Sequence, residues 1–224
     1  MSLIIFDLDG TLVDSRPDLV RTVNAAMAEL DRPAVSAAEV GPWIGRGSRV
    51  LFASALRHHG LDPQAPGFDL EAAFQRFLVH YGDNLTVDTV IYPKVAETLS
   101  ALKADGHTLA VCTNKPERFV APLLAHFGIG GHFSALLGGD SLPQRKPDPE
   151  PLRHLARRFG QDPARCAMVG DSRYDIEAAR GAGMPVAGLD HGYGGAEEFA
   201  ECPPDVVLAG FAQIPAWLRE RGLA

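Results

Sequence analysis

Short runs of consecutive apolar residues, separated by segments with helical spacing, constrain the fold of this chain more than any other feature. An apolar run without alternation is typical of a strand that is buried on both faces, as in a parallel sheet. Four such runs, and a weaker fifth, lie at residues 2–6, 109–112, 166–169, 186–189 and 206–208. Helical patterns lie at residues 93–104, 116–127, 151–159 and 175–182. This alternation predicts a Rossmann-like α/β fold, in which an open parallel sheet is covered by helices on both faces.

Residues 15–84 interrupt the alternation, because they carry helical patterns and no convincing strand. Ser15 is placed to cap a helix, and Pro17 falls in the first turn of that helix. An apolar stripe then follows with helical spacing, at Leu19, Val23, Met27 and Leu30. Two further helical patterns lie at residues 50–56 and 70–81. We therefore expect a core domain of residues 1–14 and 85–224, and an inserted α-helical domain of residues 15–84, with the hinge at residues 14–16 and 83–88.

Charge and composition exclude several classes of partner. The formal net charge of −7 over 224 residues argues against nucleic acid and anionic membranes. No apolar run approaches the roughly 18 residues of a membrane span, and the N-terminus lacks the pattern of a signal peptide. The three cysteines are far apart and odd in number, so neither a disulfide framework nor a metal site is predicted. We expect small buried thiols and a cytoplasmic location.

Pairs of acids follow two of the predicted strands. Asp7 and Asp9 come directly after the first strand, in the sequence Phe-Asp-Leu-Asp-Gly-Thr-Leu, and Asp171 and Asp175 follow the strand at residues 166–169. Ligand sites in open α/β sheets lie at the carboxyl ends of strands, so these acids are candidate site residues. Turn-forming aspartates at a solvated strand end, and capping of the next helix by Asp171, are the structural alternatives.

Two more signals lie at predicted strand ends or in loops near them. Thr113 and Asn114 follow the strand at residues 109–112, where a hydroxyl group and free backbone N–H groups suit a phosphate. Lys146 lies in a proline-rich loop. Taken singly, an ordinary Asn helix cap and a solvated surface lysine explain these residues. All four signals occur in order along the chain. If these residues formed no site, all four structural alternatives would have to be true at once, which is improbable.

With these four segments the chain resembles the haloacid-dehalogenase-like phosphohydrolase superfamily, in the subfamily that carries a helical cap. The DxDGT, Thr, Lys and GDxxxD segments carry the resemblance, which covers the whole chain. The resemblance is narrower still, to bacterial phosphoglycolate phosphatases, and it is carried by residues 43–47, 138–147, 192–194 and 204–206. The resemblance implies that residues 15–84 form a cap that closes over the site and excludes water.

The resemblance also implies the roles of the acids. Asp7 would be the nucleophile, since a carboxylate is ionised at neutral pH and needs no base, and it would form an aspartyl-phosphate. Asp9 would be the general acid for the leaving group and then the base for water. Haloacid dehalogenases lack this second aspartate, so Asp9 favours phosphate chemistry. Mg²⁺ would be held by Asp7, the backbone carbonyl of Asp9, and Asp171. Asp175 would either lie behind these ligands without binding the ion or bind it through a water molecule.

The remaining predicted site residues would bind the substrate. Lys146 would neutralise the nucleophile and a phosphoryl oxygen, and the Thr113 hydroxyl and the Asn114 backbone N–H would hold phosphoryl oxygens. Arg46, in the helical domain, would read a substrate carboxylate. A solvated arginine beside a flexible turn is the alternative for Arg46.

The predicted function is therefore Mg²⁺-dependent hydrolysis of a small phosphorylated metabolite, 2-phosphoglycolate. The same core with another substrate is an alternative: a nucleotide, pyrophosphate or a sugar phosphate. A phosphomutase similar to β-phosphoglucomutase is a second alternative, and a binding module on an inactive scaffold is a third. The presence of Asp7, Asp9, Thr113, Lys146 and Asp171 argues against the inactive scaffold. No oligomeric state follows from the pattern.

Overall fold

The computed structural model describes residues 1–223, and the chain divides into two compact units. The sheet unit contains Met1–Asp14 and the chain from Ile91 onward, and the helical unit is Ser15–Val90. The first boundary between the units lies between Asp14 and Ser15. The second lies after residue 90 rather than after residue 84, because the preceding helix continues to Asp83 and the segment 87–89 binds within the helical unit.

The sheet unit is built on one six-stranded sheet in which every recorded strand pair is parallel. Its strands are β1 (Leu3–Phe6), β4 (Thr108–Cys112), β5 (Ala135–Leu137), β6 (Cys166–Gly170), β7 (Val186–Leu189) and β8 (Val206–Leu208). Their order is β5-β4-β1-β6-β7-β8. Five of the six strands were predicted. The short edge strand β5 was not, because three residues are too few to show a pattern.

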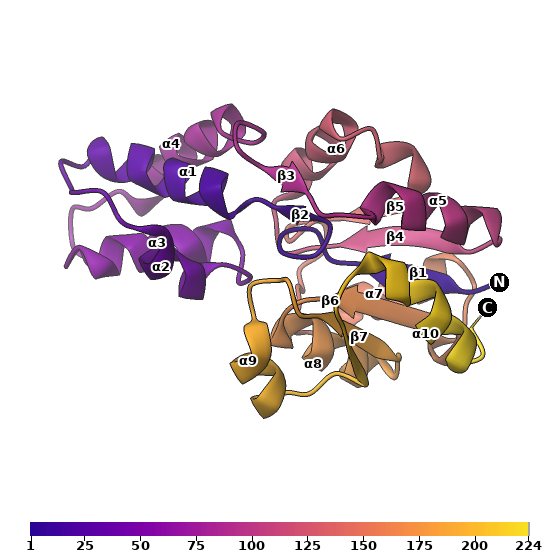
Figure 1. Ribbon diagram of the computed structural model, residues 1–224. Helices are drawn as coiled ribbons and strands as arrows, with labels where there is room; N and C mark the ends of the chain where they lie inside the picture. The colour runs from indigo at the N-terminus through magenta and orange to yellow at the C-terminus, as the bar shows by residue number, and fades with distance from the viewer. Residues whose placement is uncertain (224) are drawn as a thin grey trace. The chain divides into compact units, whose positions relative to one another are not determined.

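Helices cover both faces of this sheet (Figure 1). They are α5 (Val95–Ala104), α6 (Glu117–His126), α7 (Glu150–Arg158), α8 (Arg173–Ala182), α9 (Gly195–Glu201) and α10 (Ile214–Glu220), with 3-10 turns at Gly130–His132, Pro163–Arg165 and Phe211–Gln213. Leu3 and Ile5 of β1 pack in one cluster with residues of α7 and α8. On the other face, the ring of Phe6 stacks on Phe211 at 5.9 Å between centroids. The alternating side chains of β1 are thus buried on both sides, as its uninterrupted apolar sequence requires.

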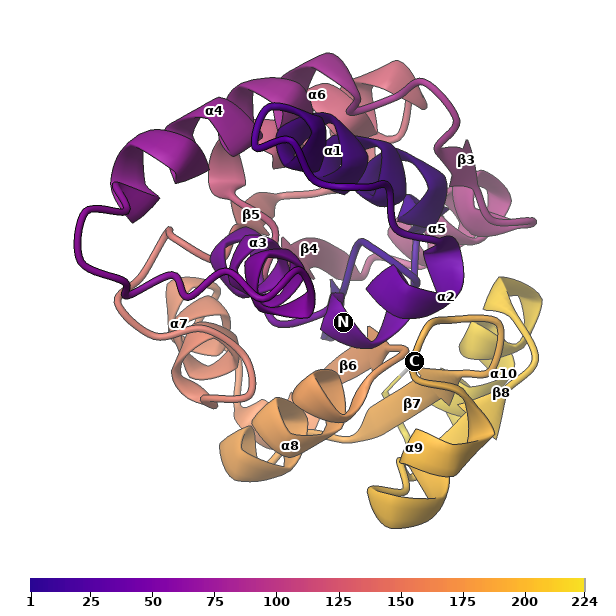
Figure 2. The same cartoon turned by 90° about the vertical axis from the view of Figure 1, so that its left-hand side faces the viewer.

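The helical unit contains α1 (Arg16–Ala28), α2 (Ala37–Val40), a 3-10 turn (Gly41–Trp43), α3 (Ser48–His58) and α4 (Leu70–Asp83). Helix α1 packs along α4 (Figure 2). The aromatic rings of Phe52, Phe74 and Phe77 pack together in the core of the helical unit, with centroids 5.0–6.1 Å apart. Ser15 stands at the N-cap as predicted, but its side chain makes no capping hydrogen bond. Two short strands that were not predicted, β2 (Val13–Asp14) and β3 (Val90–Ile91), form a separate two-stranded sheet.

Asp18 is the buried acid of the helical unit. Its side chain accepts hydrogen bonds from the backbone N–H groups of Val87 (3.0 Å), Asp88 (2.9 Å) and Thr89 (2.8 Å), and from the Thr89 hydroxyl (2.6 Å). The segment after α4 is thereby tied to the first turn of α1. Among residues 1–223, no helix has both the length and the apolar character needed to cross a bilayer.

Candidate active site

Three predicted site residues lie at the carboxyl ends of three adjacent strands of the sheet. Asp7 follows β1, Thr113 follows β4 and Asp171 follows β6. The register pairs Phe6 of β1 with Val111 of β4 and with Val169 of β6, so the strands end at nearly the same level. The Asp7 backbone N–H extends the ladder by donating to the Val169 carbonyl at 3.0 Å. Parallel pairing therefore brings together residues that are far apart in sequence.

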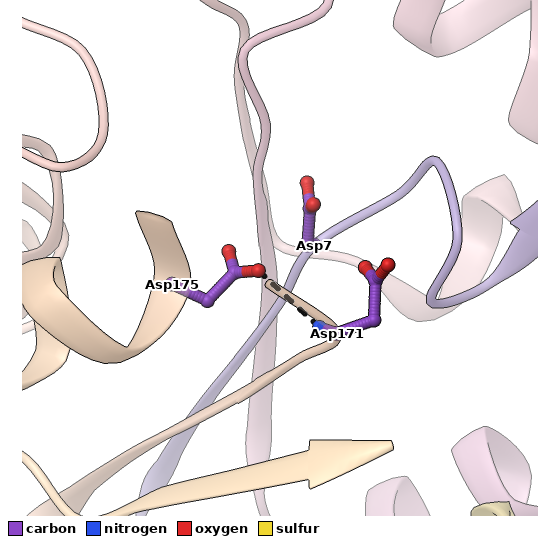
Figure 3. Close-up of side chains that lie close together, drawn as sticks. All are labelled: Asp7, Asp171 and Asp175. Carbon is purple, nitrogen blue, oxygen red and sulfur yellow. Dashed lines mark hydrogen bonds between the residues drawn. The ribbon is translucent and has the colours of Figure 1, made fainter. Parts of the chain in front are cut away.

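Asp7, Asp171 and Asp175 form a cluster of buried carboxyl groups. Figure 3 shows the three side chains gathered at this strand edge, with Asp175 coming from the first turn of α8. One carboxylate oxygen from each lies within 4.8 Å of the others. Burial raises the pKa of Asp7 to about 7; the Lys146 charge opposes this shift and the Asp175 charge adds to it. Burial, and then the charges of Asp175 and Asp7, raise the pKa of Asp171 well above its usual value.

Protein donors already occupy both oxygens of Asp175. Its Oδ1 lies 2.5 Å from the Lys146 ammonium. Its Oδ2 accepts from the Ser172 hydroxyl at 2.7 Å and from the backbone N–H groups of Ser172 (3.1 Å) and Asp171 (3.3 Å). The carboxylate of Asp175 therefore holds the turn that presents Asp171. The helix cap lies at Ser172 and Asp175, so the alternative in which Asp171 caps this helix is wrong.

The Asp171 side chain is fixed by two residues to which the sequence interpretation gave no role. The Thr11 hydroxyl donates to its Oδ1 at 2.8 Å, and the Tyr193 backbone N–H donates to its Oδ2 at 2.7 Å. Residue 192 approaches so closely that a Cβ atom there would lie 2.1 Å from the Asp171 Cβ. Only glycine fits at position 192. The signal in the sequence was the Gly-Tyr-Gly segment, which was noted for its resemblance and not for a contact.

Lys146 brings positive charge into the cluster. Its Nζ lies 2.9 Å from the Asp7 Oδ1 and 2.5 Å from the Asp175 Oδ1, and the side chain is only 2% exposed. Burial by itself lowers the pKa of Lys146, but the charges of Asp175 and Asp7 more than reverse this, so its net pKa lies above the ordinary value. Lys146 is therefore a fixed ammonium, and the alternative of a solvated surface lysine is wrong.

Asp9 pairs with a lysine that the sequence interpretation passed over. The Lys115 Nζ lies 3.0 Å from the Asp9 Oδ1, and the lysine side chain is 1% exposed. Because Lys115 follows Thr113 and Asn114 at the end of β4, the same strand end supplies both predicted phosphate-binding groups and this ammonium. A lysine directly after a strand-end Thr-Asn pair was the signal that could have pointed to it.

Thr113 and Asn114 are both buried at the end of β4. The Thr113 hydroxyl accepts from the Lys115 backbone N–H at 3.2 Å. The Asn114 side-chain amide donates to the Lys146 carbonyl at 2.9 Å, so it joins the two loops that carry the site's lysines. The predicted use of the Thr113 hydroxyl and the Asn114 N–H on a phosphate stays a prediction.

Arg46 belongs to the helical unit, where it is exposed between the turn at Gly41–Trp43 and α3. Its predicted contact with a substrate carboxylate stays a prediction. Trp43 packs on His58 with ring centroids 5.4 Å apart, in agreement with a packing role for this tryptophan.

A family of known enzymes has the same sequence pattern. Residues 1–183 match the model of the haloacid dehalogenase-like hydrolases. The chain belongs to this family. It is 48% identical over 214 residues to a phosphoglycolate phosphatase of Pasteurella multocida, covering 95% of this chain and 96% of the relative. It is 46% identical, with the same coverage, to a phosphoglycolate phosphatase of Haemophilus influenzae.

Solved structures share the fold of this chain. A crystal structure of a predicted phosphoglycolate phosphatase from Haemophilus somnus is 42% identical and superposes with a TM-score of 0.90, covering 97% of both chains. The structure of CbbY from Rhodobacter sphaeroides, in complex with phosphate, is 27% identical with a TM-score of 0.82 and covers 96% of both chains. The architecture predicted from the sequence is confirmed.

The cluster in this hydrolase fits a divalent cation. Three carboxyl groups lie together, and the ammonium of Lys146 contacts two of them, so full ionisation would leave a net negative charge in a largely buried place. The Asp7 Oδ1 has that ammonium as a charge partner but no well-aligned hydrogen-bond donor among the described residues. Carboxylate oxygens are the donors that Mg²⁺ prefers. Asp7 and Asp171 are the side chains that would hold it.

Proposed function

We propose that this hydrolase is a Mg²⁺-dependent phosphatase that converts 2-phosphoglycolate to glycolate and phosphate through an aspartyl-phosphate on Asp7. The observation that carries the proposal is the buried Asp7 at the end of β1, with Lys146 Nζ 2.9 Å from its Oδ1 and Asp171 beside it. The choice of 2-phosphoglycolate is supported by the phosphoglycolate phosphatases that are 46% and 48% identical to this chain. We place the enzyme in the cytoplasm, in agreement with three cysteines that are buried and free.

In the first half-reaction, a carboxylate oxygen of Asp7 attacks the phosphorus atom and the bond to the glycolate oxygen breaks. Asp9 gives its proton to that oxygen as it leaves, so that glycolate departs as an alcohol. Lys146 offsets the negative charge that the nucleophile and the phosphoryl group bring together. The Thr113 hydroxyl and the Asn114 backbone N–H hold the phosphoryl oxygens in place.

In the second half-reaction, Asp9 takes a proton from water, and the hydroxide oxygen attacks the phosphorus of the aspartyl-phosphate. The bond to the Asp7 oxygen breaks, so phosphate is released and the Asp7 carboxylate is restored. Bound Mg²⁺, held by Asp7, Asp171 and the Asp9 carbonyl, would supply positive charge that lowers the repulsion between the nucleophile and the phosphate. The helical unit would serve as a cap that excludes water, with Arg46 reading the substrate carboxylate.

The experiment that tests this function is phosphate release in the presence of Mg²⁺ across a panel of phosphates. We expect the highest kcat/KM with 2-phosphoglycolate, and lower values with nucleoside monophosphates, pyrophosphate, sugar phosphates and phosphoserine. A preference for one of the others would overturn the assigned substrate and keep the chemistry. Trapping of a sugar bisphosphate intermediate would instead identify a phosphomutase.

A matched pair of variants tests the role of Arg46. Arg46→Met removes the guanidinium, and Arg57→Met removes one from an exposed position elsewhere in the helical unit. If Arg46 reads the carboxylate, its variant raises KM for 2-phosphoglycolate about tenfold and leaves p-nitrophenyl phosphate unaffected, since that substrate has no carboxylate. Equal loss on both substrates would contradict this role.

A further inference from the structure

The ion pair between Lys115 and Asp9 is not used in the proposed mechanism, which gives Asp9 a role but gives Lys115 none. Its two residues are 106 positions apart in sequence, and the Lys115 Nζ lies 3.0 Å from the Asp9 Oδ1. The lysine side chain is 1% exposed and that of Asp9 is 13% exposed. A lysine is almost never this deeply buried unless it has a partner, because its ammonium loses its hydration.

The backbone that carries Lys115 is held from both sides. Its N–H donates to the Thr113 hydroxyl at 3.2 Å, and its carbonyl accepts from the Gly139 N–H at 2.8 Å. Residue 139 approaches so closely that a Cβ atom there would lie 2.4 Å from the Asn114 carbonyl oxygen. The loop that follows β5 thus clamps the strand end, and the root of the lysine side chain is fixed.

The two aspartates after β1 are each held by a different buried lysine. Lys146 approaches the Asp7 Oδ1 at 2.9 Å and Lys115 approaches the Asp9 Oδ1 at 3.0 Å. The two lysines come from different loops, and the Asn114 amide joins these loops through the Lys146 carbonyl. One short segment therefore presents two carboxylates whose orientations are set separately.

We propose that Lys115 is a positioning residue whose ammonium fixes the Asp9 carboxylate in the orientation required for proton transfer. The proposal rests on the role of Asp9 in the proposed function. Proton transfer needs heavy atoms within hydrogen-bond reach, and a misplacement of about 1 Å costs about 100-fold in rate. Lys115 acts through Asp9 and touches no reacting atom.

A double-mutant cycle tests this on the purified enzyme with Mg²⁺ and 2-phosphoglycolate. The variants are Lys115→Met, Asp9→Asn and the double variant, with Lys103→Met as a control that removes an exposed lysine from the sheet unit. We expect Lys115→Met to lower kcat by about 10- to 100-fold with little change in KM. The double variant should be no slower than Asp9→Asn alone, because the partner through which Lys115 acts is already gone. Lys103→Met should match the wild type.

Several outcomes would overturn the positioning role. Losses that multiply in the double variant would show that Lys115 acts independently of Asp9. A raised KM, or weaker inhibition by inorganic phosphate, would make Lys115 a substrate-binding residue. Wild-type kcat in Lys115→Met would leave it no role. Wild-type kcat in Asp9→Asn would be a failure of the proposed function itself, and this result is read from that variant alone.

Burst kinetics with p-nitrophenyl phosphate separate positioning from a general structural defect. p-Nitrophenolate leaves without a proton, so formation of the aspartyl-phosphate does not need Asp9, whereas its hydrolysis does. We expect Lys115→Met to keep the initial burst of p-nitrophenolate and to lose steady-state rate, as Asp9→Asn does. Lys115→Arg should recover part of that rate. Loss of the burst, with the fold intact by circular dichroism, would contradict the proposal.

Discussion

Asp18 in the helical unit and Asp7 in the sheet unit are both buried carboxylates, but the groups around them differ. Asp18 accepts from four donors that reach it from residues 87–89. Asp7 has the Lys146 ammonium and the Leu8 backbone N–H beside it, and two further carboxyl groups close by. A carboxylate whose hydrogen bonds are complete stabilises the fold, whereas one left short of donors and crowded by like charge is available for chemistry.

Removing the Asp7 carboxylate should have the largest effect on activity. Asp7→Asn keeps the shape of the side chain but cannot form the aspartyl-phosphate, so we expect turnover to fall by about 10⁴-fold or more. The free energy of unfolding should not fall at pH 8, since a charge that the fold accommodates poorly is gone. Phosphate release and urea denaturation check the two halves. Retained turnover would remove Asp7 as the nucleophile.

Removing the Asp18 carboxylate should show the opposite pattern. Asp18→Ala leaves the buried N–H groups of residues 87–89 without an acceptor, so we expect the free energy of unfolding to fall by about 3 kcal/mol. Urea denaturation measures this. Glu29→Gln is the matched control, because Glu29 pairs with Arg76 and His80 near the surface of the same unit; its effect should stay below about 1 kcal/mol. Equal effects of the two variants would end the contrast between Asp18 and Asp7.

A substitution that crowds Asp171 tests whether a small displacement of this side chain lowers the activity. Gly192→Ala puts a methyl group 2.1 Å from the Asp171 Cβ, which is too close for both atoms to stay in place. We expect kcat to fall by about 100-fold and the concentration of Mg²⁺ needed for half-maximal activity to rise. Gly131→Ala is the control, since a Cβ atom there meets nothing within 4 Å. A Gly192→Ala enzyme with wild-type Mg²⁺ dependence would show that Asp171 need not stay where it is.

The raised pKa of Asp7 gives the sheet unit a pH dependence of defined sign. The folded protein keeps a proton on Asp7 up to a pKa of about 7, whereas the unfolded chain releases it near its ordinary pKa of 3.8. In metal-free protein this contribution to stability is fully present below 3.8 and is lost as the pH rises through 7. Mg²⁺ must displace that proton. We therefore expect saturating Mg²⁺ to raise the Tm by several degrees more at pH 8 than at pH 5.5.

Differential scanning fluorimetry with and without Mg²⁺ measures this difference, and Asp7→Asn is the control. The variant lacks the Asp7 carboxylate both as a proton site and as a candidate Mg²⁺ ligand, so its Mg²⁺ response should be small and equal at both pH values. An equal Tm shift at pH 5.5 and pH 8 in the wild type would contradict proton competition at Asp7.

The fold could be predicted from the sequence because apolar runs and helical spacing are local signals. The strand at residues 3–6 is buried on both faces, and its uninterrupted apolar run showed this directly. The contacts of Asp18 could not be predicted in the same way, because an acid in the first turn of a helix is already explained by the helix dipole. Its donors lie 69–71 residues further along the chain.

The candidate site shows the same division. Asp7, Asp9 and Asp171 stand in recognisable motifs at strand ends. The partners that fix them come from tertiary structure: Lys115 meets Asp9 across 106 positions, and the Tyr193 N–H meets Asp171 from a different loop. The edge strand β5 could not be predicted because it is short, yet the loop after it holds Lys115 through the hydrogen bond from the Gly139 N–H to the Lys115 carbonyl. Short elements and long-range pairs carry the part of the site that a motif does not encode.

The sheet order has a consequence for how the enzyme is made. Strand β1 is synthesised before β4 and β6 but lies between them, and Thr11 is separated from its partner Asp171 by 160 positions. Asp7 is therefore synthesised well before Asp171 and Asp175, and such long-range contacts are slow to form. A nascent or truncated chain that ends before β6 contains the DxD segment but lacks Asp171 and Asp175. We therefore expect activity only after the strands on both sides of β1 have been added to the sheet.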